Sequence, residues 1–590
     1  MMEALRLMDQ GSQADVIVIG GGPAGSAAAT MLARQGWRVV LLERERFPRD
    51  HVGESLLPAS IPILEELGVL PAVEEQGFLK KRGATMVWGR DKEPWSWFFG
   101  ETNRRYPHSY QVWRPTFDHL LLSNADANGV DVRQGWRATE VTFTHSPKDE
   151  PILRDPVHQD RLSGEGRNPD SVRMGRLPDE QLLLTVRCLD ESGQQQAISA
   201  RFVVDATGQN GLLGRQLDLR RWDESFRNLA VYAYYEGAQR LPPPADTNIF
   251  IESYAHGWLW TIPLHTGLAS IGAVVDQQEG EEQVRKLGLQ RFIEEQLAQA
   301  RHTSQMLSKA RQVSGPFIVK DWSYACENIA GDGYVLAGDA ACFIDPLFSS
   351  GVHLALMSGV LAAAYTTTCL RNPEMGSAAA SVYQELYMKE YHHFREMVRL
   401  FYSSNRTVDS YFWEARRILE GEEEQESGLS PRASFIQAVA GQPPQGYERM
   451  VLERGAAPTR FAQSVRAVED DRARRQAKFE EYLEAQSGNP PPILSRSPRL
   501  NSGVAVERKP VAGDGEFEWG YVLVTAGHPE GLPCSQLVAR LMAMLDGETT
   551  VGGLLNALAS EVDQSQQQQI LSSIISTLQI LYVDGTIAEL

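Results

Sequence analysis

The sequence predicts an α/β protein in which a Rossmann-type βαβ unit is joined to a second sheet, a helical region and a small α+β C-terminal domain. Three observations predict this fold class. An apolar run of β-branched residues at 15–20, typical of a buried parallel strand, leads directly into a glycine-rich turn. Strand-like segments with many aromatic residues recur over 231–275. A stretch rich in proline, serine and glycine at 486–515 separates the last part of the chain.

The first elements follow one another in βαβ order. After the strand at 15–20, small residues at 23–35 predict a helix that can pack closely, and 38–42 predicts a second buried strand. Strand-like and helical segments then alternate to about residue 145. The polar, proline-containing stretch at 146–180 predicts a long insertion at the surface.

At 590 residues the chain is too long for one hydrophobic core, so several domains are expected. Composition and turn signals divide it into a core with both sheets, a helical region, a linker and a small C-terminal domain, at 12–380, 381–485, 486–515 and 516–590.

Composition and charge exclude several classes of function. The net charge of -19 argues against nucleic acid or an anionic membrane surface as the main partner. The five cysteines are scattered, without a C-x-x-C pair, which argues against a zinc ribbon or a disulfide scaffold and favours a reducing, cytoplasmic location. No signal peptide is visible in the first 14 residues. Threonines, small residues and a histidine interrupt the apolar run at 352–370, which therefore predicts a buried helix, not a membrane span.

A nucleotide-binding fingerprint lies between the first strand and the first helix. Gly20, Gly22 and Gly25 satisfy G-x-G-x-x-G, which allows a tight turn, close approach of a pyrophosphate and close helix packing. Glu43 ends the second strand, where its carboxylate can accept hydrogen bonds from ribose hydroxyls. The sequence therefore predicts a dinucleotide site.

Two later segments favour FAD over NAD as the dinucleotide. Residues 203–208 and 334–340 each close a strand with a turn, and the second ends on Asp339. Both resemble motifs of FAD-binding enzymes of the glutathione-reductase type, in which this aspartate meets the ribityl-phosphate region. Ser349, Ser350 and Gly351 then begin a helix, which suits either an anion site or a plain helix cap.

Two tryptophans in a single strand form a candidate wall. Trp258 and Trp260 have the i,i+2 spacing that places two side chains on one side of a strand, and Pro263 stops that strand from extending as a central one. Two adjacent indoles can separate a substrate from a reactive flavin. They can equally fill a hydrophobic core, which is the common fate of aromatic residues in strands.

Together these motifs resemble the flavin-dependent halogenases over about residues 12–420. The resemblance is carried by the fingerprint and by His-Val-Gly-Glu-Ser-Leu-Leu-Pro at 51–58, Lys-Arg-Gly-Ala at 81–84, Trp-Leu-Trp-Thr-Ile-Pro at 258–263 and Asp-Pro-Leu-Phe-Ser-Ser-Gly at 345–351. The form of the 51–58 motif is similar to the branch that acts on phenols, pyrroles and carrier-tethered acyl groups.

The resemblance implies that FAD, reduced by a separate flavin reductase, reacts with O2 and with chloride or bromide to form hypohalous acid. Lys81 then directs this oxidant to an electron-rich aromatic ring, free or tethered to a carrier protein. Lys80 points away if the segment is extended. An ammonium can polarise the oxidant and a neutral amine can form a haloamine, and the sequence does not choose between them.

The resemblance also assigns the remaining site residues. The wall is formed by Trp258, Trp260, Ile262 and Pro263. The halide lies against backbone N–H groups near Ser350 and Gly351. Arg114 lies near the cofactor, with a surface salt bridge as the alternative role. The region 381–485 is expected to cover the substrate site.

Two further hypotheses remain open at this stage. The first is a flavin-dependent monooxygenase or reductase of the same fold that needs no halide. The absence of a second G-x-G-x-x-G agrees with a separate reductase but is a weak signal, because some monooxygenases bind NAD(P)H without such a domain. The second hypothesis concerns 516–590, where the preceding linker suggests a docking module for a carrier protein or synthetase.

Overall fold

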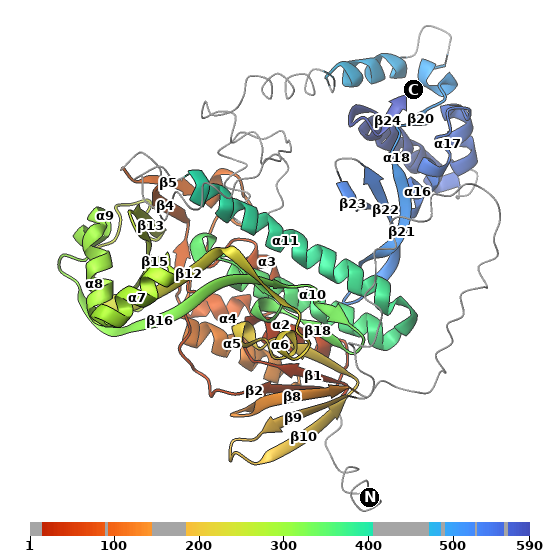
Figure 1. Ribbon diagram of the computed structural model, residues 1–590. Coiled ribbons are helices and arrows are strands. Elements are labelled where there is room, and N and C mark those ends of the chain that lie inside the picture. Colours follow the sequence, from red (N-terminus) through yellow and green to blue (C-terminus); the bar gives the residue numbers. More distant parts are fainter. Residues whose placement is uncertain are drawn as a thin grey trace, which may run out of the picture. The chain divides into compact units, whose positions relative to one another are not determined.

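The computed structural model describes residues 14–88, 93–143, 184–404, 471, 473–484, 490–525, 528–559 and 564–590. These residues form two compact units, one that ends at Ser404 and one that begins at Asp471 (Figure 1). The insertion predicted at 146–180 lies outside the described residues, as does most of the helical region predicted at 381–485.

The first unit is built on the predicted Rossmann sheet. Its six strands lie in the order β17-β18-β11-β1-β2-β7, and all neighbours are parallel except β17 and β18. The central strands are buried along their whole length, which explains their continuous runs of valine, isoleucine and leucine. Their bounds are β17 Ala330–Gly331, β18 Tyr334–Leu336, β11 Phe202–Asp205, β1 Val16–Ile19, β2 Val39–Glu43 and β7 Asp131–Gln134.

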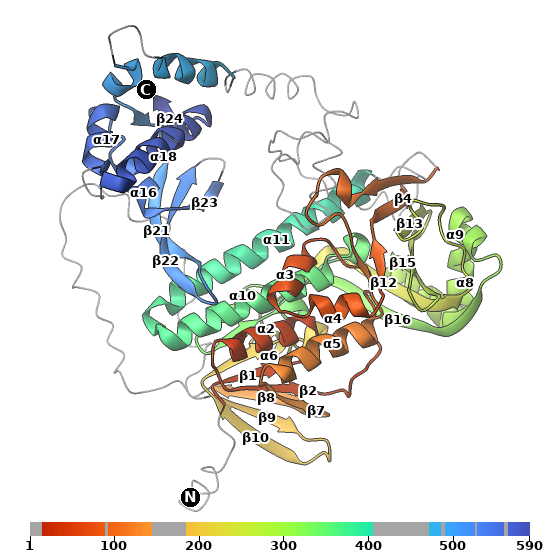
Figure 2. The ribbon, with the colours of Figure 1, turned by 180° about the vertical axis from the view of Figure 1, so that it is seen from behind.

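Four helices position the edge of this sheet. The fingerprint helix α2 (Pro23–Arg34) packs between α5 (Arg114–Ala127) and α10 (Gly351–Arg371), and α10 packs in turn against α11 (Gly376–Ser404). Figure 2 shows α10 and α11 running side by side, with α2 and α5 nearer the strands. Small residues make the closest packing possible, since a Cβ at Gly359 in α10 would lie 2.4 Å from the Ala24 carbonyl oxygen in α2.

The second sheet has eight strands in the order β19-β16-β12-β15-β14-β13-β4-β5. Only β4 and β13 pair in parallel. One face is covered by α7 (Gln277–Leu287) and α8 (Leu289–Gln299), which close a separate apolar core. The strands are β19 Cys342–Phe343, β16 Arg311–Cys326, β12 Arg220–Glu236, β15 Leu268–Asp276, β14 Gly257–Pro263, β13 Ile249–Tyr254, β4 Gly83–Val87 and β5 Trp95–Phe98.

Two short sheets complete the unit. Strands β3 (Leu79–Lys81) and β6 (Ser109–Gln111) pair in antiparallel fashion, and a second sheet holds β8 (Arg137–Phe143), β9 (Leu184–Leu189) and β10 (Gln195–Ala200).

The domain boundary predicted at 380/381 is wrong, because α11 runs through it without a break. Two buried tyrosines tie this helix to the Rossmann sheet. The Tyr383 hydroxyl donates to the Leu336 carbonyl at 2.7 Å, and the Tyr387 hydroxyl donates to the Gly338 carbonyl at 3.0 Å. The described start of the predicted helical region, residues 381–404, therefore belongs to the core.

Helix α10 is the one described helix that is long and apolar enough to cross a membrane, and 72% of its apolar window is buried inside the protein. Its length and composition are also those of a core helix, which agrees with the buried helix predicted at 352–370.

The second unit is a small α+β domain. A three-stranded antiparallel sheet of β21 (Ala505–Ala512), β22 (Phe517–Thr525) and β23 (His528–Cys534) accompanies several helices, and β20 (Arg499–Leu500) pairs with β24 (Ile587–Glu589). The helices include α16 Gln536–Ala543, α17 Val551–Ala559 and α18 Gln564–Val583.

The linker predicted at 486–515 is largely wrong. Strand β21 pairs with β22 over its full length, and Ile493 is buried in the core of the same unit. Pro510 suggested a linker, but β21 is an edge strand, where a residue without an N–H is tolerated.

Candidate active site

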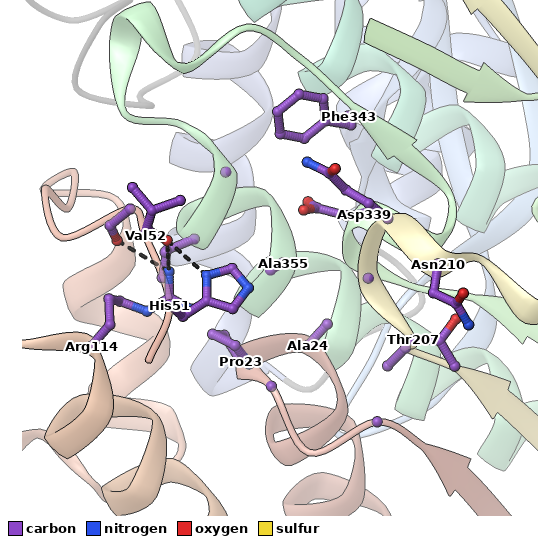
Figure 3. A pocket seen from close by; sticks show the side chains of 18 of the residues that line it. Pro23, Ala24, His51, Val52, Arg114, Thr207, Asn210, Asp339, Phe343 and Ala355 are labelled. Carbon is purple, nitrogen blue, oxygen red and sulfur yellow. Dashed lines mark hydrogen bonds between the residues drawn. The ribbon is translucent and has the colours of Figure 1, made fainter. Parts of the chain in front are cut away.

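A large cavity of about 880 Å³ opens along the carboxyl edge of the Rossmann sheet. Figure 3 shows Pro23 and Ala24 at the start of α2 facing the same space as His51, Arg114 and Asp339. The second sheet contributes Tyr232, Trp258 and Trp260 to the opposite side. Both sheets therefore enclose one site, as expected for ligands of open α/β sheets.

The fingerprint glycines are required by the backbone geometry. A Cβ at Gly25 would lie 1.9 Å from the Gly20 carbonyl oxygen, and Gly20 itself has a φ of +106°. Gly22 occupies the N-cap of α2 without any side-chain capping bond. The first turn of α2 therefore presents backbone N–H groups to the cavity, where they can bind a pyrophosphate.

Two carboxylates lie where a dinucleotide needs them. Glu43 is buried at the end of β2, and its Oε2 accepts a hydrogen bond of 2.7 Å from the Gly21 N–H. Asp339 lines the cavity beside the N-terminus of α10, and burial raises the pKa of its carboxyl to about 6. The exposed part of Asp339 faces the cavity, so a hydrogen-bonding ligand would replace water there (Figure 3). These residues and the glycine cradle fit FAD.

Arg114 is a buried residue, so the alternative of a surface salt bridge is wrong. Its guanidinium makes two bonds to Asp118, of 2.8 Å and 2.9 Å, and donates to the carbonyls of Val52 and Gly53 at 2.7 Å and 3.2 Å. Gly53 has a φ of +103°, and a Cβ there would lie 3.0 Å from the guanidinium. Arg114 lines the cavity and also holds the 51–54 loop against it (Figure 3).

Glu54 of the 51–58 motif forms a buried polar pair that no sequence motif predicted. The fully buried Glu54 lines the cavity and accepts a hydrogen bond of 2.8 Å from the Tyr234 hydroxyl, with Oε1 as the acceptor. Burial raises the pKa of the Glu54 carboxyl above its usual value. Tyr234 lies on β12, far from Glu54 in the sequence. The one signal for this pair in the sequence is Glu54 itself, a charged residue next to the apolar end of its motif.

The tryptophan side chains form one wall of the cavity. Trp258, Trp260 and Ile262 all line it, as their alternation on β14 predicts, whereas Pro263 does not. The two indole centroids are 6.1 Å apart. A Cβ at Gly272 on β15 would lie 2.2 Å from the Trp260 ring, so only a glycine leaves enough space there for the indole. A glycine inside a strand is the signal that could have revealed this contact.

Lys81 is completely enclosed by protein. Its side chain is 1% exposed, whereas Lys80 on the other face of β3 is exposed. The Lys81 Nζ donates to the Leu56 carbonyl at 3.0 Å and lies 5.6 Å from the centroid of the Phe99 ring. No carboxylate among the described residues pairs with it, and desolvation lowers its pKa to about 7.

Lys81 lines a second, small cavity of about 20 Å³. Its other walls are apolar side chains from neighbouring strands, together with the loop before α10. Ile249 and Ser349 line both this cavity and the large one, so the two spaces are direct neighbours. The second cavity is lined by Leu57, Lys81, Ala84, Trp97, Phe99, Ile249, Ile251, Leu347, Phe348 and Ser349.

The N-terminus of α10 lies between the two cavities. Ser350 is its N-cap residue, yet its side chain makes no capping bond, so the plain helix cap is not observed. Ser350 is 3% exposed and is not among the lining residues, whereas Ser349 and Gly351 line the large cavity. Backbone N–H groups in this first turn remain suited to an anion.

Two family profiles match this chain. One described as Tryptophan halogenase matches residues 182–469, and one described as FAD binding domain matches residues 13–168. A tryptophan 2-halogenase from Chondromyces crocatus is 32% identical over 413 residues, which span 70% of this chain and 72% of that protein. The chain belongs to the flavin-dependent halogenases. The predicted family, the FAD-binding fold and the use of FAD with a halide are therefore confirmed.

The name of another relative specifies a substrate other than tryptophan. The 1H-pyrrole-2-carbonyl peptidyl-carrier-protein chlorinase of Pseudomonas fluorescens is 30% identical, over 69% of this chain and 87% of that protein. Among solved structures, the myxobacterial chondrochloren halogenase CndH is 34% identical with a TM-score of 0.61, and covers 75% of this chain and 92% of its own.

The expectation that the resemblance ends near residue 420 is wrong. The flavin-dependent halogenase CmlS is 27% identical with a TM-score of 0.67, and the match covers 96% of both chains. The C-terminal unit is therefore shared with another halogenase. Its docking role stays a prediction.

Proposed function

We propose that this halogenase chlorinates or brominates an electron-rich aromatic ring, phenolic or pyrrole-like, and that Lys81 directs the oxidant to that ring. The observation that carries the proposal is the enclosed Lys81 amine in a small apolar cavity that adjoins the cofactor cavity. The similarity to a carrier-protein chlorinase supports a tethered substrate as well as a free one. The flavin reductase that such enzymes need and the cytoplasmic location are parts of the same proposal.

The residues divide the work between two places. FAD is bound by the fingerprint together with Glu43 and Asp339. When it is reduced, it allows O2 to oxidise a halide ion by two electrons. Backbone N–H groups near Ser350 and Gly351 hold the halide next to the cofactor. The Trp258–Trp260 wall keeps the aromatic substrate out of the cofactor cavity. Hypohalous acid then passes Ile249 and Ser349 to reach Lys81.

The charged form of Lys81 suits this role best. The Leu56 carbonyl and the Phe99 ring both favour an ammonium, and its remaining N–H groups can donate to the oxygen of the hypohalous acid. Such a bond makes the halogen more electrophilic, so that it replaces a ring proton while water leaves.

The direct test is incubation with FAD, a flavin reductase and chloride or bromide. The aromatic panel contains free and carrier-bound phenols and pyrroles, with free tryptophan as the comparison. We expect halogen isotope patterns by mass spectrometry on a phenol or pyrrole and not on tryptophan. Halogenation of tryptophan alone, or hydroxylated product without halogen, contradicts the proposal.

The wall makes a prediction of its own. Trp260→Leu leaves a space beside Gly272, so we expect more reduced FAD to be consumed as H2O2 and less halogenated product, together with about 3 kcal/mol lower stability. The matched control is Trp222→Leu, because Trp222 is 45% exposed and does not line the cavity. An unchanged ratio of product to H2O2 in Trp260→Leu favours the core-filling alternative.

Halide binding by the backbone makes another prediction. Ser350→Ala should leave the KM for chloride and for bromide unchanged, because the side chain neither caps α10 nor lines the cavity. Initial rates at varied halide concentration measure this. A KM raised by about 10-fold would assign the halide to the hydroxyl instead.

A further inference from the structure

Four buried side chains meet behind the tryptophan wall. They are Trp258 on β14, Asn228 on β12, Tyr402 near the end of α11 and Asp345 in the loop before α10, and none is more than 1% exposed. The Trp258 Nε1 donates to the Tyr402 hydroxyl at 2.6 Å, and that hydroxyl donates to the Asp345 Oδ2 at 2.8 Å. The Asn228 Nδ2 donates to the same carboxylate oxygen at 2.6 Å. We call these four residues the Asp345 cluster.

The chemistry of the indole determines the direction of the bonds made by the Tyr402 hydroxyl. An indole nitrogen can only donate, and a hydroxyl has one proton to give. The Tyr402 hydroxyl must therefore accept from Trp258 and donate to Asp345. Because one hydroxyl makes both bonds, it fixes the tryptophan ring relative to the aspartate, and no apolar side chain could do so.

Asp345 carries this constraint into the loop before α10. Its second oxygen, Oδ1, accepts from the Leu347 N–H at 3.0 Å and so caps the short 3₁₀ turn Pro346–Phe348. The residues that follow Asp345 line both cavities: Pro346 and Ser349 face the large one, and Phe348 and Ser349 face the one around Lys81. The cluster therefore connects the wall to the boundary between the two cavities.

Helix α11 makes a second contact with the same boundary. The Phe401 ring packs edge-on against Phe348, with centroids 4.9 Å apart, and the Trp88 Nε1 donates to the Phe401 carbonyl at 2.9 Å. The end of α11 is thus held beside the loop independently of Tyr402. Loss of the Tyr402 hydroxyl should therefore alter the cluster without releasing the helix.

We propose that Tyr402 is a positioning residue for halide oxidation. Its hydroxyl fixes Trp258 relative to the loop before α10 and so keeps water out of the cofactor cavity. The inference rests on the role of the tryptophan wall in the proposed function. Tyr402 lies on α11, and none of the sequence motifs includes a residue of this helix.

The two outcomes of flavin oxidation provide the measurement. In the coupled reaction, reduced FAD, O2, a halide ion and a proton give oxidised FAD, hypohalous acid and water. In the uncoupled reaction, reduced FAD and O2 give oxidised FAD and H2O2. The coupling ratio is the amount of oxidised halogen, collected by an added β-diketone trap, divided by the amount of reduced FAD consumed.

Tyr402→Phe should bind FAD normally and consume reduced FAD at the normal rate. We expect its coupling ratio to fall by about 10-fold, with H2O2 accounting for the difference, because a small misplacement near reacting groups has effects of that size or larger. The fluorescence of Trp258, measured as the difference from Trp258→Phe, should change as its indole loses this hydrogen bond.

The matched control is Tyr383→Phe. Tyr383 is a fully buried tyrosine on the same helix that also donates one hydrogen bond, to the Leu336 carbonyl, and it does not contact the Asp345 cluster. Its coupling ratio should stay at the wild-type value. In the double variant Trp258→Phe, Tyr402→Phe the two losses of coupling should not multiply, because part of the effect of Tyr402 passes through its bond with Trp258.

The proposal is overturned if Tyr402→Phe keeps the wild-type coupling ratio, or if Tyr383→Phe loses coupling equally. Since the ratio is measured with the trap alone, it does not depend on the aromatic substrate. A wild-type protein that oxidises halide but halogenates no ring in the panel would contradict the substrate proposal and leave the result for Tyr402 intact.

Discussion

Lys81→Met should bind FAD and consume reduced FAD normally, yet form halogenated product about 10³-fold more slowly. The methionine fills the space of the lysine stem but cannot donate to an oxidant. Product formation is followed by mass spectrometry, and flavin oxidation by absorbance. Lys80→Met is the matched control, because Lys80 is adjacent in the chain and exposed on the other face of β3.

The same variant should be more stable than the wild type at low pH. The pKa of Lys81 is lowered by burial from 10.5 to about 7, so between these values the unfolded chain binds more protons than the folded one. Stability therefore rises with pH through this window, and the cost of the buried charge is greatest below pH 7. We expect Lys81→Met to raise the melting temperature of the first unit by a few degrees at pH 6, equivalent to about 3 kcal/mol, and to have a smaller effect near pH 10.

Catalysis should respond to the same proton in the opposite direction. If the ammonium polarises the oxidant, halogenated product per reduced FAD consumed falls as the pH rises through about 7. A yield that rises over this range would instead indicate a haloamine formed on the neutral amine. Full activity of Lys81→Met at any pH would show that Lys81 is not needed for halogenation.

Gly25→Ala should abolish FAD binding. The new Cβ would lie 1.9 Å from the Gly20 carbonyl oxygen and 3.2 Å from the Ala206 Cβ, so the turn that presents the N-terminus of α2 cannot keep its shape. All of the close atoms are backbone or a short side chain, and none of them can rotate away. We expect FAD affinity to fall by more than ~100-fold and the first unit to lose about 3 kcal/mol of stability.

Titration of flavin fluorescence and thermal unfolding measure these two effects. The matched control is Gly376→Ala at the start of α11, where the new Cβ would lie 3.6 Å from the Cys369 sulfur, which is an ordinary contact. Normal FAD affinity in Gly25→Ala would show that this turn does not bind the pyrophosphate. Equal loss in Gly376→Ala would show that any added methyl group disturbs the unit.

Local patterns were sufficient to predict much of the site. The family resemblance selects Lys81, and the alternation of side chains along a strand then places Lys80 on the other face. The same alternation predicts that Trp258 and Trp260 share one face. The fingerprint specifies part of its own turn, because Gly25 is required by contact with the Gly20 carbonyl only five residues away. In these cases a short motif contains most of the constraint.

The C-terminal region shows where local patterns fail. Proline, serine and glycine at 486–515 indicate a linker, but strand β21 forms there because β22 offers a full hydrogen-bonding partner. Composition records the preference of an isolated segment and takes no account of such a partner. The boundary at 380 failed similarly, since the tyrosines of α11 are anchored by carbonyls of distant residues.

The sequence alone determined the cofactor class and the family and gave Lys81 as a prediction, because each depends on a short motif whose geometry is local. The tertiary structure alone decided which groups surround them. Tyr402 and Trp258 are separated by 144 positions, and Asn228 and Asp345 by 117, yet hydrogen bonds join them in one buried cluster. Such contacts form only when the second sheet, α11 and the loop before α10 pack together, since most polar groups buried by that packing are paired with one another.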